Sequence, residues 1–203
     1  MNDKILRVVF FLLAITFTLD LYGLYRLSKH SDNFAAYNLN LLVEAVCLSI
    51  FFYQIFKKLL FKKIILSIGI LFILYWVYKF IRAGGSNVFL NTFETIKNIS
   101  IFAFAVYYYY ERVIKINATS VFSRPSFWVV TAYLFYIAGT FFLFLYLPSL
   151  SPTDQEKYYV LNYVFVVIRT ILLSIAMFMK TDVQDDTTNS LKVTSTLSKK
   201  SFN

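Results

Sequence analysis

The chain is poor in the residues that usually carry metal and redox chemistry: its 203 residues include one cysteine and one histidine. Cys47 has no second cysteine to pair with, so an intrachain disulfide is excluded. With His30 as the sole imidazole, a zinc or haem site is not expected. The sequence also has no G-x-S-x-G, no H-E-x-x-H and no phosphate-binding glycine loop. We therefore predict no metal, no cofactor and no enzymatic activity.

Charge is also scarce, at 15% of residues, whereas 59% are hydrophobic and 20% are aromatic. Soluble domains average about 25% charged residues, and a chain of this length has too much surface to hide such an apolar surplus. The formal net charge of +9 comes from basic residues in short clusters between apolar runs. That distribution is typical of membrane topology rather than of a nucleic-acid-binding face. We expect the lipid bilayer, and not nucleic acid, as the partner.

Six continuous apolar segments are long enough to cross the hydrocarbon core, which takes about 20 helical residues. They cover approximately Ile5–Leu24, Tyr37–Phe56, Lys63–Ile81, Val88–Tyr109, Phe127–Leu147 and Tyr158–Met179. Continuous runs exclude transmembrane β-strands, whose residues alternate. The sequence thus predicts an all-α, polytopic transmembrane bundle of about six helices over residues 1–180. Residues 181–203 are rich in Ser, Thr, Asp and Lys and are predicted to form a disordered tail.

The basic residues between these segments predict how the bundle is oriented. Thirteen of them fall on one side: Lys4, Arg7, Lys57, Lys58, Lys62, Lys63, Arg112, Lys115, Arg124, Lys180, Lys192, Lys199 and Lys200. Five fall on the other: Arg26, Lys29, Lys79, Arg82 and Lys157. Because cytoplasmic loops carry the excess of Lys and Arg, both termini are predicted to be cytoplasmic, in a multi-pass protein of the inner membrane.

Five ionisable residues fall inside the apolar segments: Asp20, Glu44, Glu94, Lys97 and Arg169. A charge at a helix centre costs about 2.5–3.5 kcal/mol, so such residues usually face a partner or water. At about 1.5 Å per residue, Asp20 and Glu94 lie roughly 7 Å outward of the midplane and Arg169 lies near it. Polar side chains accompany them in the same half of the bilayer or close to the midplane. We therefore predict a polar pocket in the outer half, formed by Asp20, Glu44, Asn91, Glu94, Lys97, Asn98, Asn162 and Arg169.

Two interpretations of this layer stay open. It is either a site for a small polar or ionic ligand, or for a proton, or it is an ion-pair network that only fixes how the helices pack. The layer has three acids and two bases, and a surplus acid is expected to bind a proton or a further cation. This surplus slightly favours a functional site.

The sequence also resembles a family of uncharacterised polytopic membrane proteins of the Bacteroidota. The stretches that carry the resemblance are Arg124–Trp128, Tyr136–Phe142, Asn38–Glu44 preceded by Asp20, and Asn162–Ala176. Proteins of that family are similar to seven-helix bundles and are often encoded near sensor histidine kinases or their response regulators. Relative to them this chain lacks the first helix, so either its bundle has six helices or the chain begins late.

From the buried charges and the resemblance together we expect a sensory or accessory module, with a sensor kinase or another membrane protein as partner. A small transporter or channel subunit for a polar or ionic solute is the alternative. It predicts polar residues through the inner half of the bundle as well, where none is evident in the sequence. The small residues Ala45 and Ser49 leave a homo-oligomer open as a further partner.

Overall fold

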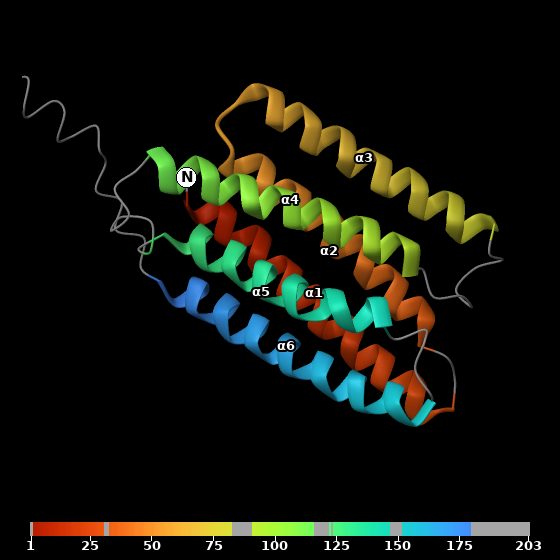
Figure 1. Cartoon of the computed structure of the whole chain (residues 1–203). Coiled ribbons are helices and arrows are strands. Elements are labelled where there is room, and N and C mark those ends of the chain that lie inside the picture. The colour runs from red at the N-terminus through yellow and green to blue at the C-terminus, as the bar shows by residue number, and fades with distance from the viewer. Residues whose placement is uncertain are drawn as a thin grey trace, which may run out of the picture.

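The computed structural model describes residues 2–30, 33–82, 91–115, 122, 124–146 and 152–179. Within these ranges all regular structure is α-helical, which confirms the predicted all-α bundle of six helices. The helices are α1 (Asn2–Ser28), α2 (Phe34–Ile55), α3 (Leu59–Arg82), α4 (Asn91–Lys115), α5 (Pro125–Tyr146) and α6 (Pro152–Phe178). Helices adjacent in the chain run antiparallel along one another (Figure 1). The expected tail, residues 181–203, lies outside the described residues.

All six helices extend beyond their apolar segments at one end or both, and the largest differences at one end are in α4 and α6. α4 continues to Lys115 beyond the expected end at Tyr109, and α6 begins at Pro152 instead of Tyr158. Hydropathy marks where a chain leaves lipid, but it does not mark where helical hydrogen bonding stops. At Pro152 the start has a local cause, because proline at the first helical position lacks only an N–H that would be unpaired anyway.

Four helices form an inner group and two lie outside it. α1, α2, α4 and α5 contact one another around the core, with contacts between α2 and α4 and between α1 and α5. α3 packs on α2 and α4, and α6 packs on α5 and α1, so that these two helices form opposite edges of the bundle (Figure 1). The helix contacts are equivalent in the two halves of the chain. If α1, α2 and α3 are exchanged with α4, α5 and α6 respectively, the set of contacting helix pairs stays the same.

In the described part of the chain, four helical spans are long and apolar enough to cross a membrane: Lys4–Arg26, Phe34–Ile55, Leu59–Arg82 and Leu161–Phe178. Large apolar side chains such as Phe17, Leu66 and Leu71 are exposed on the outer surface, and together with these helices they indicate a membrane protein. α4 differs because its charged residues face inward and lower the apolar content of the helix.

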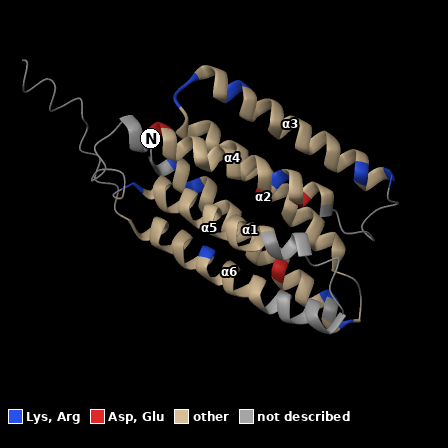
Figure 2. Ribbon diagram, in the orientation of Figure 1, with Lys and Arg blue, Asp and Glu red and all other residues tan. Residues whose placement is uncertain are grey.

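Most of the described Lys and Arg residues lie near the two ends of the bundle, and a few charged residues lie between the ends (Figure 2). We call the end that carries the N-terminus the basic end; its described basic residues are Lys4, Arg7, Lys57, Lys58, Lys62, Lys63, Arg112 and Arg124. Among the residues whose side chains the structure describes, the opposite end holds fewer, namely Arg26, Lys29, Lys79 and Arg82. Which of the two ends faces the cytoplasm stays a prediction.

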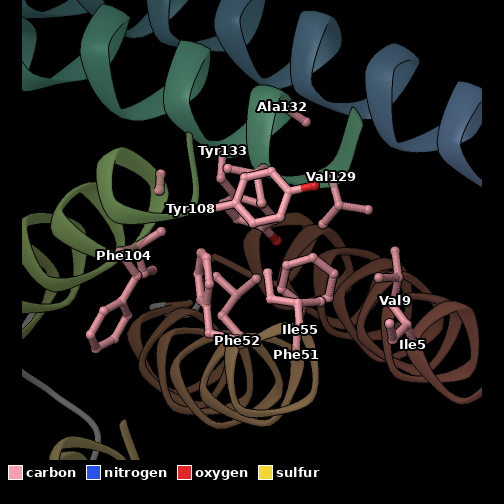
Figure 3. Packing of buried hydrophobic residues seen from close by; sticks show 14 of the residues in the cluster. Ile5, Val9, Phe51, Phe52, Ile55, Phe104, Tyr108, Val129, Ala132 and Tyr133 are labelled. Carbon is pink, nitrogen blue, oxygen red and sulfur yellow. The ribbon is translucent and has the colours of Figure 1, made fainter. Parts of the chain in front are cut away.

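An apolar core fills the part of the bundle nearer the basic end (Figure 3). Phe51, Phe52 and Phe104 are buried there, and the ring centroids of Phe52 and Phe104 are 5.4 Å apart. Tyr108 is fully buried and forms a 3.0 Å hydrogen bond with the hydroxyl of Ser126. Tyr108 therefore packs inside the bundle, whereas Tyr110, from the same tyrosine run, is exposed.

Small residues allow each of the two edge helices, α3 and α6, to lie close to its neighbour in the inner group. Gly69 of α3 faces Ser49 of α2, where an added Cβ would lie 3.3 Å from the Ser49 Cβ. Ala45 is buried in a cluster with Phe72 and Phe93. Ala45 and Ser49 of α2 therefore pack against other helices of the same chain. At the other edge, the ring of Phe165 on α6 occupies the space that a Cβ at Gly139 would need.

Candidate functional site

Three charged side chains from three helices meet in the interior of the bundle. The Glu44 carboxylate on α2 accepts a 2.9 Å hydrogen bond from Arg169 Nη1 on α6 at its Oε1 atom. Its Oε2 atom pairs with the Lys97 ammonium on α4. We call Glu44, Lys97 and Arg169 the charged triad. Both oxygens of one carboxylate are used, so the triad ties together three helices that are not consecutive in the chain.

Aromatic residues of α5 enclose the arginine of the triad. The Arg169 guanidinium lies 4.4 Å from the ring centroid of Tyr136 and 5.6 Å from that of Tyr133. Guanidinium groups are attracted to aromatic faces at such distances. The Tyr133 side chain also hydrogen-bonds Glu44. Tyr133 and Tyr136 recur at helical spacing within one apolar segment, which is the signal in the sequence that could have identified them.

Two further acids flank the triad. Glu94 lies one turn before Lys97 on α4, and its Oε2 accepts a 3.1 Å hydrogen bond from the Tyr37 hydroxyl. Asp20 on α1 is exposed, yet it is near enough to Arg169 and Glu44 for their charges to act on it. The signs therefore alternate across the bundle, and we call the series Glu94, Lys97, Glu44, Arg169 and Asp20 the charged row.

The three asparagines of the predicted pocket differ in their burial and surroundings. Asn98 is buried on the inward face of α4, beside Lys97 in sequence. Asn162 is half-buried on α6, and its buried Oδ1 atom has no hydrogen-bond partner in the described part of the chain. Asn91 begins α4, but its side chain lies outside the described residues. A polar contact that was not predicted joins Thr16 Oγ1 to Asn40 Oδ1 at 3.0 Å, between α1 and α2.

A second charged cluster lies at the basic end, where none was expected. Glu111 and Arg112 of α4 are each 7% exposed. Arg112 Nη2 donates a 3.1 Å hydrogen bond to the Ile55 carbonyl oxygen. The last carbonyls of a helix lack intrahelical donors and attract cations, so Arg112 caps the end of α2. Sequence reasoning assigned Arg112 to a connecting loop because the apolar segment ends at Tyr109.

A cavity of about 380 Å³ lies between α4 and α5, lined by Ile99, Phe102, Ile137, Ala138 and Phe141. None of the eight predicted pocket residues lines it. The triad residues contact one another instead, which satisfies part of their charge internally. Within the described residues, the ion pairs of the row engage Glu44, Lys97 and Arg169, with Glu94 and Asp20 as the flanking acids.

Replacing Tyr136 with leucine tests how Arg169 is held. We expect a loss of about 0.5–2 kcal/mol in unfolding free energy, because the cation–π contact is removed in a desolvated site. Tyr136→Phe keeps the ring and should cost less. Denaturant unfolding of the purified protein in mixed micelles measures both variants. If phenylalanine is as costly as leucine, the hydroxyl and not the ring face is what matters.

Comparison with known proteins gives no match, whether to protein-family models, to curated proteins or to solved structures. The function is therefore argued below from the geometry of the charged row and its position in the bundle.

Proposed function

We propose that the chain is a membrane-embedded sensory or accessory module in which the charged row receives a signal and the basic end transmits it. The observation that carries this proposal is the charged triad, which joins α2, α4 and α6 in a low-dielectric interior. Removing one partner of a buried ion pair is strongly unfavourable. A ligand that perturbs one member of the triad would therefore shift the contacts among all three helices.

α4 gives this shift a route through the protein. It carries Lys97 at one end and Arg112 at the other, both buried, and Arg112 is bonded to the end of α2. The side chains between them on the same face, such as Phe104 and Tyr108, pack tightly in the core. A close-packed helix moves as a unit rather than deforming locally. Displacement at the charged row is thus expected at the basic end, where exposed lysines are available to a partner.

The proposed sidedness follows from the excess of Lys and Arg, which places the basic end in the cytoplasm and the charged row towards the periplasm of the inner membrane. The resemblance to proteins encoded beside histidine kinases supports a kinase as the partner. If the partner is a kinase, the chain should alter the activity of that kinase when the two are reconstituted together. Equal kinase activity with and without the chain would contradict the proposed signalling role.

Complementation of a deletion strain tests the role of the triad. We expect Glu44→Gln, Lys97→Met and Arg169→Gln to lose complementation even when expression is adjusted so that their membrane levels, judged by immunoblot, match wild type. Thr18→Val is the matched control, because Thr18 is exposed and its hydroxyl, within the described residues, donates to the Ala14 carbonyl oxygen of its own helix. If all three triad variants fold normally and complement fully, the triad has only a packing role and the proposal fails.

A small transporter is the second candidate, favoured by one observation. The two halves of the bundle have equivalent neighbours, and because each half has three helices, they run in opposite directions. Inverted repeats of this kind are typical of transporters. Glu111 and Arg112 also place polar groups in the half where a pathway would need them, although Phe51, Phe52 and Phe104 separate them from the charged row. Solute flux into proteoliposomes at wild-type levels, abolished by Glu44→Gln, would favour this candidate.

A further inference from the structure

We propose that residues 57–63, which lead from α2 into α3, form a binding surface for the phosphate headgroup of an anionic phospholipid. We call this segment the lysine turn; its basic residues are Lys57, Lys58, Lys62 and Lys63. The interaction does not require the sensory role proposed above, because it depends only on the charge and the position of this turn.

The lysine turn carries four positive charges in seven residues, and no acid is among them. Lys57, Lys58 and Lys63 are exposed, and Lys62 is partly exposed. Lys58 and Lys62 are one helical turn apart, where like charges repel each other, and cations at the start of a helix also oppose its dipole. These lysines therefore do not stabilise α3, whereas a phosphate group beside them would neutralise the repulsion.

Apolar residues place the lysine turn at the level of the lipid headgroups. Leu59 and Leu60 lie between the two pairs of lysines and are 68% and 65% exposed. Exposed apolar side chains continue along α3, a helix long enough to cross a membrane, with Ile64, Leu66 and Ile70. Lysines at the end of such a surface reach from the acyl region to the headgroups. The leucines and lysines together thus match the two parts of an anionic phospholipid, whereas an acidic soluble protein complements the lysines alone.

Aromatic contacts hold the lysine turn in place. The Phe61 ring stacks on the Tyr107 ring of α4, with the centroids 3.7 Å apart, and Phe56 packs edge-on to the same ring at 5.1 Å. The Lys62 ammonium lies 5.1 Å from the ring centroid of Tyr53. Because the turn is already held by these contacts, less conformational freedom is lost when its lysines bind a phosphate group.

The same contacts connect the lysine turn to α4. Tyr107 belongs to that helix, and Arg112, also on α4, donates its hydrogen bond to the Ile55 carbonyl oxygen just before the turn. A lipid bound at the turn therefore stabilises the packing of α2, α3 and α4 at the basic end, as does any ligand that binds only the folded state.

The test is native mass spectrometry of the purified full chain, released from neutral detergent micelles that contain phosphatidylglycerol or phosphatidylcholine at the same mole fraction. We expect phosphatidylglycerol to bind about 30-fold more tightly, which corresponds to about fivefold for each of two lysines in reach of one phosphate. Lys57→Gln combined with Lys58→Gln should reduce this preference by about fivefold or more. Lys57→Arg combined with Lys58→Arg keeps both charges and should retain it.

Lys4→Gln combined with Arg7→Gln is the matched control, because it removes two exposed charges from α1 at the same end and leaves the lysine turn intact. This control should keep the preference for phosphatidylglycerol. Equal affinities for the two lipids in the wild-type chain overturn the proposal. An equal loss in the control and in the turn variant also overturns it, because the attraction would then be a diffuse effect of net charge.

Free glycerol 3-phosphate tests the source of the phosphate group. At the concentration of the lipid it should not displace phosphatidylglycerol, because it has no acyl chains to contact Leu59 and Leu60. Full displacement would overturn the lipid assignment in favour of a soluble phosphate. If the Lys57→Gln, Lys58→Gln chain keeps its lipid preference but loses its effect on a kinase reconstituted with it, the proposal is also overturned, and the turn contacts an acidic protein instead.

Discussion

Glu44→Gln is expected to lower the unfolding free energy by about 3–5 kcal/mol, because the substitution leaves Lys97 and Arg169 buried without a counter-charge. The Glu44 carboxylate uses one oxygen for each base, and a glutamine amide supplies one acceptor and no charge. Equilibrium unfolding of the purified chain in mixed micelles measures the loss.

Glu94→Gln is the matched control for this prediction. Glu94 is equally an acid buried in the same layer, but the direct contact described for it is the hydrogen bond from Tyr37, which a glutamine oxygen still accepts. Its cost should therefore be clearly smaller than that of Glu44→Gln. Equal losses in the two variants would contradict the view that the triad, rather than acidity at that depth, stabilises the bundle.

Gly139→Ala should cost about 1–3 kcal/mol, a large effect for one methyl group, because the new Cβ overlaps the Phe165 ring and forces α5 and α6 apart. Phe165→Leu in the same chain removes the overlap and should recover most of the loss. The double-mutant cycle, measured in the same unfolding assay, isolates this contact from the effects of each single substitution.

Gly23→Ala supplies the opposite expectation. The atoms nearest to a Cβ at Gly23, those of Ala36 and Asn33, lie 3.9 Å away, which is ordinary van der Waals contact. Alanine in a helix interior is favoured over glycine by about 0.5–1 kcal/mol, so this variant should be neutral or stabilised. If Gly23→Ala and Gly139→Ala are equally destabilising, the close approach of Phe165 is not the cause.

The helical class and the number of helices were predictable from hydropathy, because each helix overlaps one continuous apolar run, although α4 and α6 extend furthest beyond theirs. The end of α4 was not predictable in this way, since Glu111 and Arg112 are polar residues that the bundle buries. Burial of such residues depends on what the other helices place around them. The carbonyl of Ile55 that receives Arg112 is far away in sequence.

The sequence predicted which ionisable residues lie at a similar depth, but not how their side chains pair. Depth along each helix brings Glu44, Lys97 and Arg169 into one layer, yet the depth of a residue does not reveal the direction in which its side chain points. Glu94 and Lys97 are three residues apart on α4, a spacing that favours contact between them, whereas Lys97 pairs directly with Glu44 on another helix. The aromatic enclosure by Tyr133 and Tyr136 was missed because the predicted pocket was built from ionisable and amide side chains alone.

The triad also has a consequence for biosynthesis. Lys97 follows Glu44 by 53 residues in the chain and Arg169 follows it by 125, so a ribosome delivers the acid well before either base. Since chains are inserted from the N-terminus onwards, α2 enters the bilayer with a carboxylate whose neutralising partners have not been made. A nascent chain that stops before α6 is left with three acids and one base at membrane depth, which gives quality-control proteases a physical feature that distinguishes incomplete chains from finished ones.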